Sequence, residues 1–302
     1  MKNAASNIAV AIVLQALSLA TCCAQQTGAS QFTEEFSKQE LIYHGRGIME
    51  VDGYVTDRSL ASYTLVLSPD FDRSLADLGP NDRWLDVGTG QGKAILDYYS
   101  ARYDLMHAQG REQRRSKAQA VGLSIEDRRT PLWEQTAAAL RVGQIQYLCN
   151  KRLRDYPLSE LGQFEVITDV FGGFSYADNV SSFMAKALGH LKLNGTLYTV
   201  LQDVMFEDRS NRPYYSGAPF LTEISTADGQ PVTVCSWLKS ISCVQVACEG
   251  KTGFRPTIET YSMRKVCNNV EVPPVELTHY EAGTPPERGY RKLPAPSDSA
   301  GN

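Results

Sequence analysis

The stretch WLDVGTGQGKAI, residues 84–95, constrains the fold of this chain more than any other segment. Gly88, Gly90 and Gly92 alternate with other residues directly after an apolar run that ends at Asp86. Glycine permits a positive φ and lets a ligand approach the main chain closely. A strand, a glycine turn and a helix in this order also direct backbone N–H groups and the positive end of the helix at one point. The segment therefore predicts a ligand-binding turn.

The glycine spacing argues against two common nucleotide-binding loops. A P-loop needs a glycine, four residues and then Gly-Lys-Ser/Thr. Counting back from Gly92 and Lys93 puts Val87 at the first glycine, and Ala94 replaces the hydroxyl residue. A dinucleotide-binding turn needs a small residue for close packing of the helix on the strand, where this chain has Lys93. Neither loop fits.

Apolar runs alternate with helical patterns on both sides of the turn. We expect strands at 84–87, 120–125, 145–149, 164–169 and 196–202, and helices at 93–99 and 131–140. A third helix, which Asp178 can cap, should run through Phe183 to Leu191. The strand runs are almost continuously apolar, as in parallel strands that are covered on both faces. Two later strands, at 243–248 and 258–266, are joined by a short linker and should pair antiparallel. The pattern predicts a doubly wound α/β sheet.

The motif D-x-G-x-G-x-G, with its acid at the end of a strand, resembles the first motif of class I S-adenosylmethionine-dependent methyltransferases. QFEVITDVFGGF, residues 163–174, resembles the fourth-strand segment of that family, and HLKLNGTLYTV, residues 190–200, resembles its helix–turn–strand. The resemblance covers roughly residues 80–267. It implies a mostly parallel seven-stranded sheet with an antiparallel edge strand, S-adenosylmethionine as cofactor, and transfer of its methyl group to a small molecule.

The resemblance also assigns roles to individual residues. Asp86 would lie near the amino group of the cofactor, and Gly88, Gly90 and Gly92 would lie under it. The second strand of the family normally ends in an acid that binds the ribose hydroxyls. Here Ser124 stands at that place, and Glu126, two residues later, is the candidate. Asp169 ends the fourth strand and is the candidate catalytic base, or else a carboxylate that braces a loop.

Two other functions stay open. GFSYA, residues 173–177, is one residue away from the G-x-S-x-G elbow of hydrolases, with Ser175 as nucleophile, Asp203 or Asp228 as the acid and His279 as the base. The second alternative is an exported, non-catalytic binding protein with a methyltransferase fold. S-adenosylmethionine is made inside cells, and the departure at Ser124 would suit a fold that has lost its cofactor.

The first residues read as a secretory signal. Lys2 is followed by an apolar run, Ile8–Leu19, and by small residues up to Ala24. The run is too short to span a bilayer comfortably, so we expect an exported protein, periplasmic or secreted, without a span after cleavage. A lipid anchor at Cys22 or Cys23 is an alternative, and an uncleaved leader would leave the protein in the cytoplasm.

We divide the 302 residues into a signal (1–24), a linker and helical extension (25–79), a methyltransferase-like domain (80–267) and a tail rich in proline and glycine (268–302). The net charge of -4 indicates neither a nucleic acid nor a membrane surface as partner. Cysteines and histidines show no metal-ligand spacing, so no metal is expected. The five later cysteines could form disulfides, with Cys149 as a buried thiol.

Overall fold

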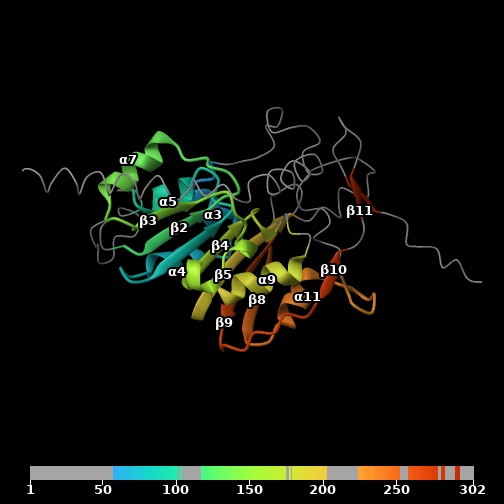
Figure 1. The fold of residues 1–302 in the computed structure, drawn as a ribbon. Helices are drawn as coiled ribbons and strands as arrows, with labels where there is room; N and C mark the ends of the chain where they lie inside the picture. Colours follow the sequence, from blue (N-terminus) through green and yellow to red (C-terminus); the bar gives the residue numbers. More distant parts are fainter. Residues whose placement is uncertain are drawn as a thin grey trace, which may run out of the picture.

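The computed structural model describes residues 57–100, 103, 117–174, 177, 179–202, 224–251 and 258–277, and the backbone of two short strands beyond them. Strands and helices alternate through these residues. The strands form a central sheet, and helices cover both of its faces (Figure 1). The doubly wound α/β fold predicted from the apolar runs is therefore confirmed.

Each predicted strand and helix of the sheet region is present, but β5 begins at Leu191, a residue that was predicted to belong to the preceding helix, and not at 196. The helices are α3 (Leu60–Val66), α4 (Phe71–Ala76), α5 (Lys93–Tyr98), α7 (Pro131–Ala139), the 3-10 helix η3 (Leu153–Asp155), α8 (Leu158–Leu161), α9 (Val180–Gly189) and α11 (Val234–Lys239). The strands are β1 (Arg83–Val87), β2 (Gln119–Leu123), β3 (Ile145–Leu148), β4 (Phe164–Val170), β5 (Leu191–Gln202), β6 (Ile224–Thr226), β7 (Pro231–Val232), β8 (Val244–Lys251), β9 (Ile258–Lys265), β10 (Val275–Leu277), β11 (Tyr280–Ala282) and β12 (Tyr290–Lys292).

The central sheet has seven strands in the order β3-β2-β1-β4-β5-β9-β8. The first five pair in parallel, whereas β9 runs antiparallel to both β5 and β8. The antiparallel pair predicted near the end of the domain thus forms one end of the sheet, with β8 outermost. The strand order reverses between β1 and β4, and ligands bind at this reversal in open sheets of this kind.

Both faces of the sheet are apolar. Trp84 of β1 packs into a core formed with α3, α4, α5 and α7, and its neighbour Leu85 packs into a second core formed with α8, α9 and α11. Both side chains are completely buried. Successive side chains of a strand point to opposite faces, so a strand with two covered faces must be apolar throughout. This explains the unbroken apolar runs.

Local signals set the helix ends. The side chain of Ser59 accepts a hydrogen bond from the backbone of Ser62 at the start of α3, and Thr130 does the same for Trp133 at the start of α7. Pro131 occupies the first turn of α7, where its missing N–H costs nothing. A break at Pro69 separates α3 from α4, so the predicted short helices before the first strand are confirmed.

The folded unit extends beyond residue 267. Trp237 of α11 donates from Nε1 to the carbonyl of Pro273 at 2.9 Å, and Ser242 accepts from the backbone of Glu271 at 2.8 Å. Val275 is 8% exposed and pairs with Thr226 in a small sheet of order β10-β6-β7. The beginning of the predicted tail therefore contacts the domain, through Glu271, Pro273 and Val275.

Several predictions fall outside the described residues. These are the signal at 1–24, the larger part of the extension, and the hydrolase residues Ser175, Asp203 and His279. Asp228 is described and lies exposed in the turn between β6 and β7, where it accepts a hydrogen bond from Thr226. Among the described helices, none is long and apolar enough to cross a bilayer.

Candidate functional site

The glycine turn follows β1 at the carboxyl edge of the sheet, and all three glycines need their conformational freedom. Their φ angles are +77° at Gly88, +55° at Gly90 and +72° at Gly92, in the left-handed region that disfavours side chains. The backbone N–H groups of Gly88 and Thr89 both donate to the carbonyl of Leu123, at 2.8 and 3.0 Å. The end of β2 therefore fixes the turn.

The three glycines meet different surroundings. A Cβ on Gly92 would lie 2.3 Å from the Trp133 ring of α7, and a Cβ on Gly88 would lie 2.7 Å from the Cα of Gly172. Gly92 is buried, whereas Gly88 is exposed and Gly90 is half-buried. Gly92 thus serves helix packing, and the main chain at Gly88 and Gly90 is the part that a ligand can reach.

Tyr147 of β3 supports the turn from the other side. Its hydroxyl donates to the carbonyl of Gly90 at 2.5 Å and accepts from the backbone N–H of Arg128 at 3.1 Å. Trp133 packs edge-on against the same ring, with centroids 5.2 Å apart. The turn after β1, the loop after β2 and the end of β3 are therefore tied into one rigid rim.

Asp86 lies directly before the turn and is completely buried. The Tyr63 hydroxyl of α3 donates to both of its oxygens at 3.1 Å, and Thr168 Oγ1 of β4 donates to Oδ1 at 2.7 Å. Burial raises the pKa of Asp86 to about 6, although these hydrogen bonds and the charge of Arg58 act to lower it. The carboxylate is therefore held in place and is costly to keep charged.

The donors to Asp86 are themselves fixed. Trp84 donates from Nε1 to Thr168 Oγ1 at 2.8 Å, so the Thr168 hydroxyl has its hydrogen directed at Asp86. Burial, together with the neighbouring carboxylate, raises the pKa of Tyr63, so its hydroxyl remains a donor. Together these residues form a polar network that connects α3, β1 and β4 across the sheet.

Asp169 of β4 is the second buried carboxylate of this edge, and its position on the strand pairs with Val87 of β1. Thr199 Oγ1 donates to its Oδ2 at 2.9 Å, and the backbone N–H of Phe174 donates to both oxygens at 3.2 and 3.3 Å. Burial raises its pKa to about 7, and the charge of Asp86 acts in the same direction. Its contacts brace the loop after β4.

The loop after β4, which Asp169 braces, contains Gly172 and Gly173. Asp169 and β1 leave no room for a side chain at Gly172. A Cβ on Gly172 would lie 2.4 Å from the carbonyl oxygen of Val87 and 2.7 Å from Oδ1 of Asp169. Phe171 precedes it with a φ of +51°, and the guanidinium of Arg58 lies 5.0 Å above the Phe171 ring. The turns after β1 and β4 therefore touch. The buried carboxylates of Asp86 and Asp169 lie next to these turns, as does the guanidinium of Arg58.

Glu126 lies apart from this acid pair. Strand β2 ends at Leu123, two residues before the predicted end at 125, and Ser124 is buried with its N–H bonded to the carbonyl of Leu148. The carboxylate of Glu126 accepts from Arg128 at 2.6 Å and is partly exposed. Glu126 thus stands on the rim after β2. Tyr147 links it to the glycine turn, because the Tyr147 hydroxyl that bonds to the Gly90 carbonyl also lies 3.2 Å from the backbone carbonyl oxygen of Glu126.

Sequence reasoning missed three residues of this site. Tyr63 reads as an apolar position of a helix, and its hydroxyl gives no further signal. Thr168 and Thr199 read as ordinary strand residues, although both are completely buried. The sequence signals only Thr168, because it is a polar residue that directly precedes the strand-terminal Asp169 in an otherwise apolar run.

The strand order decides the fold family. Five parallel strands with the reversal between β1 and β4, followed by a reversed strand inserted between β5 and β8, match the arrangement that the resemblance implies. The chain has the class I methyltransferase fold.

Comparisons with solved structures find proteins of low sequence identity. The N-methyltransferase NodS from Bradyrhizobium japonicum, in complex with S-adenosyl-L-homocysteine, is 11% identical, with a TM-score of 0.42 over 77% of this chain and 98% of NodS. The cyclase SpnF is 15% identical, with a TM-score of 0.45 over 72% of this chain and 86% of SpnF. A protein of Bordetella parapertussis described as a possible exported protein is 16% identical, with a TM-score of 0.41 over 66% of this chain and 67% of that one. No protein-family model and no curated protein sequence matches the chain.

Proposed function

We propose that this methyltransferase-fold protein binds S-adenosylmethionine across Gly88 and Gly90 and transfers its methyl group to a small molecule. The observation that carries the proposal is the glycine turn itself. Its reachable main chain lies at the strand-order reversal, immediately after a buried acid whose hydrogen bonds hold it in place. The fold supports the wider class of methyltransferase, and these residues support the proposed position of the cofactor.

The charges of the site suit a cationic ligand. Asp86 and Asp169 are both buried and both have raised pKa values, and the charge of Asp86 contributes to the raised pKa of Asp169. A positive group at this edge would relieve that repulsion. S-adenosylmethionine supplies a methyl group on a positively charged sulfur, together with an ammonium group. Asp86 would hold the ammonium end, and Gly88 and Gly90 would let the cofactor lie against the main chain.

Asp169 is assigned a positioning role in this proposal. Both of its oxygens accept hydrogen bonds from the protein, and the side chain is completely buried. It holds the Gly172–Phe174 loop next to Gly88, and its charge adds to that of Asp86. In an in-line methyl transfer, orientation and exclusion of water can supply much of the rate acceleration, so a rigid loop serves the reaction without a base.

Glu126 is proposed to bind the ribose hydroxyls. It stands on the rim next to the glycine turn, where it pairs with Arg128 and is partly exposed. Glu134 of α7 is a matched control, because it also pairs with an arginine, Arg129, but lies on a helix surface. Glu126→Gln should weaken cofactor binding, and Glu134→Gln should leave it unchanged.

We also propose that the protein is exported. The N-terminal leader motivates this proposal, and two disulfides support it, Cys235–Cys248 and Cys243–Cys267, because such bonds persist in oxidising compartments. Determination of the N-terminal residue of the protein isolated from its own cells tests the proposal. A start near residue 25 or a lipid on Cys22 or Cys23 supports export, and an intact leader contradicts it.

Calorimetric titration with S-adenosylmethionine and S-adenosylhomocysteine tests the proposed function. We expect micromolar binding that is lost in Gly90→Val, where a side chain would occupy the reachable main chain. Gly229→Ala is the matched control, since Gly229 also has a positive φ but lies in a distant turn with open space around it. If neither compound binds to the folded protein, the proposal is wrong, and the fold serves another ligand.

A further inference from the structure

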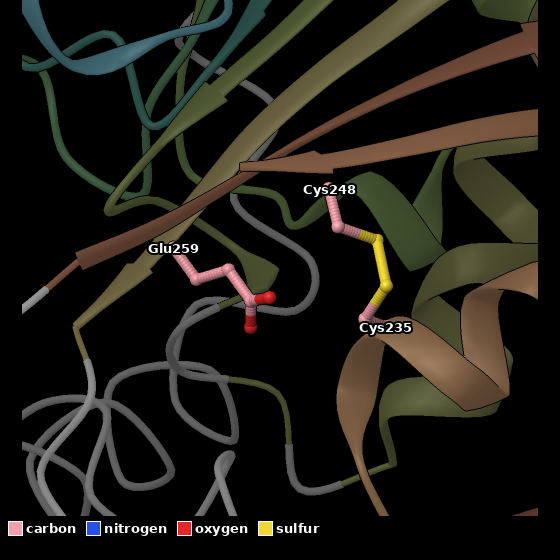
Figure 2. Close-up of side chains that lie close together, drawn as sticks. All are labelled: Cys235, Cys248 and Glu259. Carbon is pink, nitrogen blue, oxygen red and sulfur yellow. A yellow bond between two sulfur atoms is a disulfide. The ribbon is translucent and has the colours of Figure 1, made fainter. Parts of the chain in front are cut away.

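Two cysteines and a glutamate converge at the β8 end of the sheet. Cys235 lies on α11, Cys248 on β8 and Glu259 on β9, and one sulfur or oxygen atom of each lies within 4.8 Å of the others. Figure 2 shows the carboxylate of Glu259 beside the Cys235–Cys248 disulfide. All three side chains are half-buried.

The register of the two strands explains the convergence. Cys248 pairs with Tyr261, and Glu259 pairs with Gly250. Paired residues and residues two apart share one face of a sheet, so Cys248, Tyr261 and Glu259 point the same way. Helix α11 covers this face and brings Cys235 to it. Among the described residues, nothing lies within 4 Å of a Cβ placed on Gly250, the residue that pairs with Glu259.

Glu259 is oriented before any ligand arrives. The Tyr261 hydroxyl donates to its Oε2 at 2.6 Å, and Tyr261 is completely buried at its ring. Metal-binding carboxylates are commonly held by such a hydrogen bond, which leaves the other oxygen for the ion. A charged carboxylate close to two sulfur atoms would repel their thiolates unless a cation lies between them.

We propose that reduction of the Cys235–Cys248 disulfide turns this cluster into a Zn²⁺ site with Cys235, Cys248 and Glu259 as ligands. Two thiolates and a carboxylate are ligands that Zn²⁺ prefers, and three protein ligands leave a fourth position for solvent. The site is separate from the glycine turn and does not depend on the proposed methyltransferase activity.

The redox step balances with a dithiol reductant. The reductant is oxidised to its disulfide, and the Cys235–Cys248 bond accepts two electrons and two protons and becomes two thiols. When Zn²⁺ binds, both thiol protons pass to solvent. The oxidised form cannot bind the ion in this way, because each sulfur is bonded to the other. The same residues therefore form a cross-link under oxidising conditions and a metal site under reducing conditions.

Cobalt substitution tests the proposal on the full-length protein. After reduction and removal of the reductant, Co²⁺ should produce the thiolate-to-metal charge-transfer band and the visible bands of a tetrahedral site, and Zn²⁺ should displace it. The oxidised protein should show neither band. Glu259→Gln should weaken Co²⁺ binding at least about tenfold, the effect expected when a metal site loses even a supporting residue.

Two controls make the result specific. The double variant Cys243→Ser, Cys267→Ser removes the other disulfide and should keep the cobalt spectrum. Glu249→Gln changes an acid on the opposite face of β8 and should bind Co²⁺ as the wild type does. The proposal is overturned if the reduced wild type shows no thiolate–cobalt band, if reduction abolishes its native circular dichroism, or if Glu259→Gln binds Co²⁺ unchanged.

Discussion

The hydroxyl of Tyr63 donates to both carboxylate oxygens of Asp86, at 3.1 Å each. Tyr63 belongs to α3, which precedes the sheet, and Asp86 is the acid of the glycine motif. Both side chains are buried. The helix before the sheet is therefore part of the candidate site and sets the orientation of its principal acid.

Tyr63→Phe should destabilise the protein and raise the pKa of Asp86 further above about 6. Hydrogen bonds to a charged group contribute about 1.5–3 kcal/mol, and their loss favours the neutral acid. Tyr198→Phe is the control, because that hydroxyl bonds to the exposed Asp70 at 3.0 Å. Urea unfolding and carboxyl NMR titration measure both effects. Equal losses in the two variants, with no change at Asp86, would contradict this role.

Stability should increase as the pH falls through the range of the two buried acids. Their folded pKa values, about 6 for Asp86 and about 7 for Asp169, lie above the unfolded value of about 3.9. The native state therefore binds protons more tightly, and this contribution is fully present below about pH 4 and lost as the pH rises through 6 and 7.

Asp169→Asn isolates one of these contributions. The difference in unfolding free energy between wild type and variant should change by up to roughly 3 kcal/mol between about pH 5 and pH 8, with the wild type relatively less stable at the higher pH. Urea unfolding at a series of pH values measures it. A difference that is independent of pH would show that Asp169 keeps an ordinary pKa in the folded protein.

Gly88→Ala should cost more than Gly229→Ala, although both residues have φ near +78°. The left-handed conformation costs a side chain about 1–2 kcal/mol at either position. Only at Gly88 would the Cβ also collide with backbone, 2.7 Å from the Cα of Gly172, which adds about 1–3 kcal/mol. Thermal and urea unfolding compare the two, and equal destabilisation would mean that the two turns do not touch.

The cysteines should react in a fixed order. Cys149 is 5% exposed, so an alkylating reagent should modify it only after unfolding. The pairs Cys235–Cys248 and Cys243–Cys267 should be modified only after reduction. Peptide mapping by mass spectrometry with and without reductant reads this directly. Modification of Cys149 in the native protein, or any other pairing among these five, would contradict the structure.

Much of the fold could be predicted because it depends on local patterns. Continuous apolar runs indicate strands with two covered faces, and the alternation with helices indicates a doubly wound sheet. The glycine turn can be predicted for the same reason, because Gly88, Gly90 and Gly92 are residues of the type that adopts a positive φ most easily. The five-strand parallel part and the antiparallel pair both follow from such signals.

Contacts between distant segments could not be predicted in this way. The Tyr63–Asp86 hydrogen bond joins α3 to β1, and the Asp169–Thr199 hydrogen bond joins β4 to β5. The distance between these residues along the sequence does not indicate that their side chains meet. The cysteine pairs and the packing of Val275 on the domain likewise depend on how the fold brings separate elements together. The sequence leaves the role of Asp169 open between catalytic base and loop brace, and its hydrogen bonds with Thr199 and the Phe174 N–H are the contacts on which the proposed positioning role rests.

A crystal structure of the protein with S-adenosylhomocysteine tests the central claim most directly. The account predicts density for the ligand against the main chain of Gly88 and Gly90, with its ammonium group within hydrogen-bond distance of Asp86 or of a water bound to it. Ligand density at another place on the fold, with no ligand against the main chain of Gly88 and Gly90, would contradict the account.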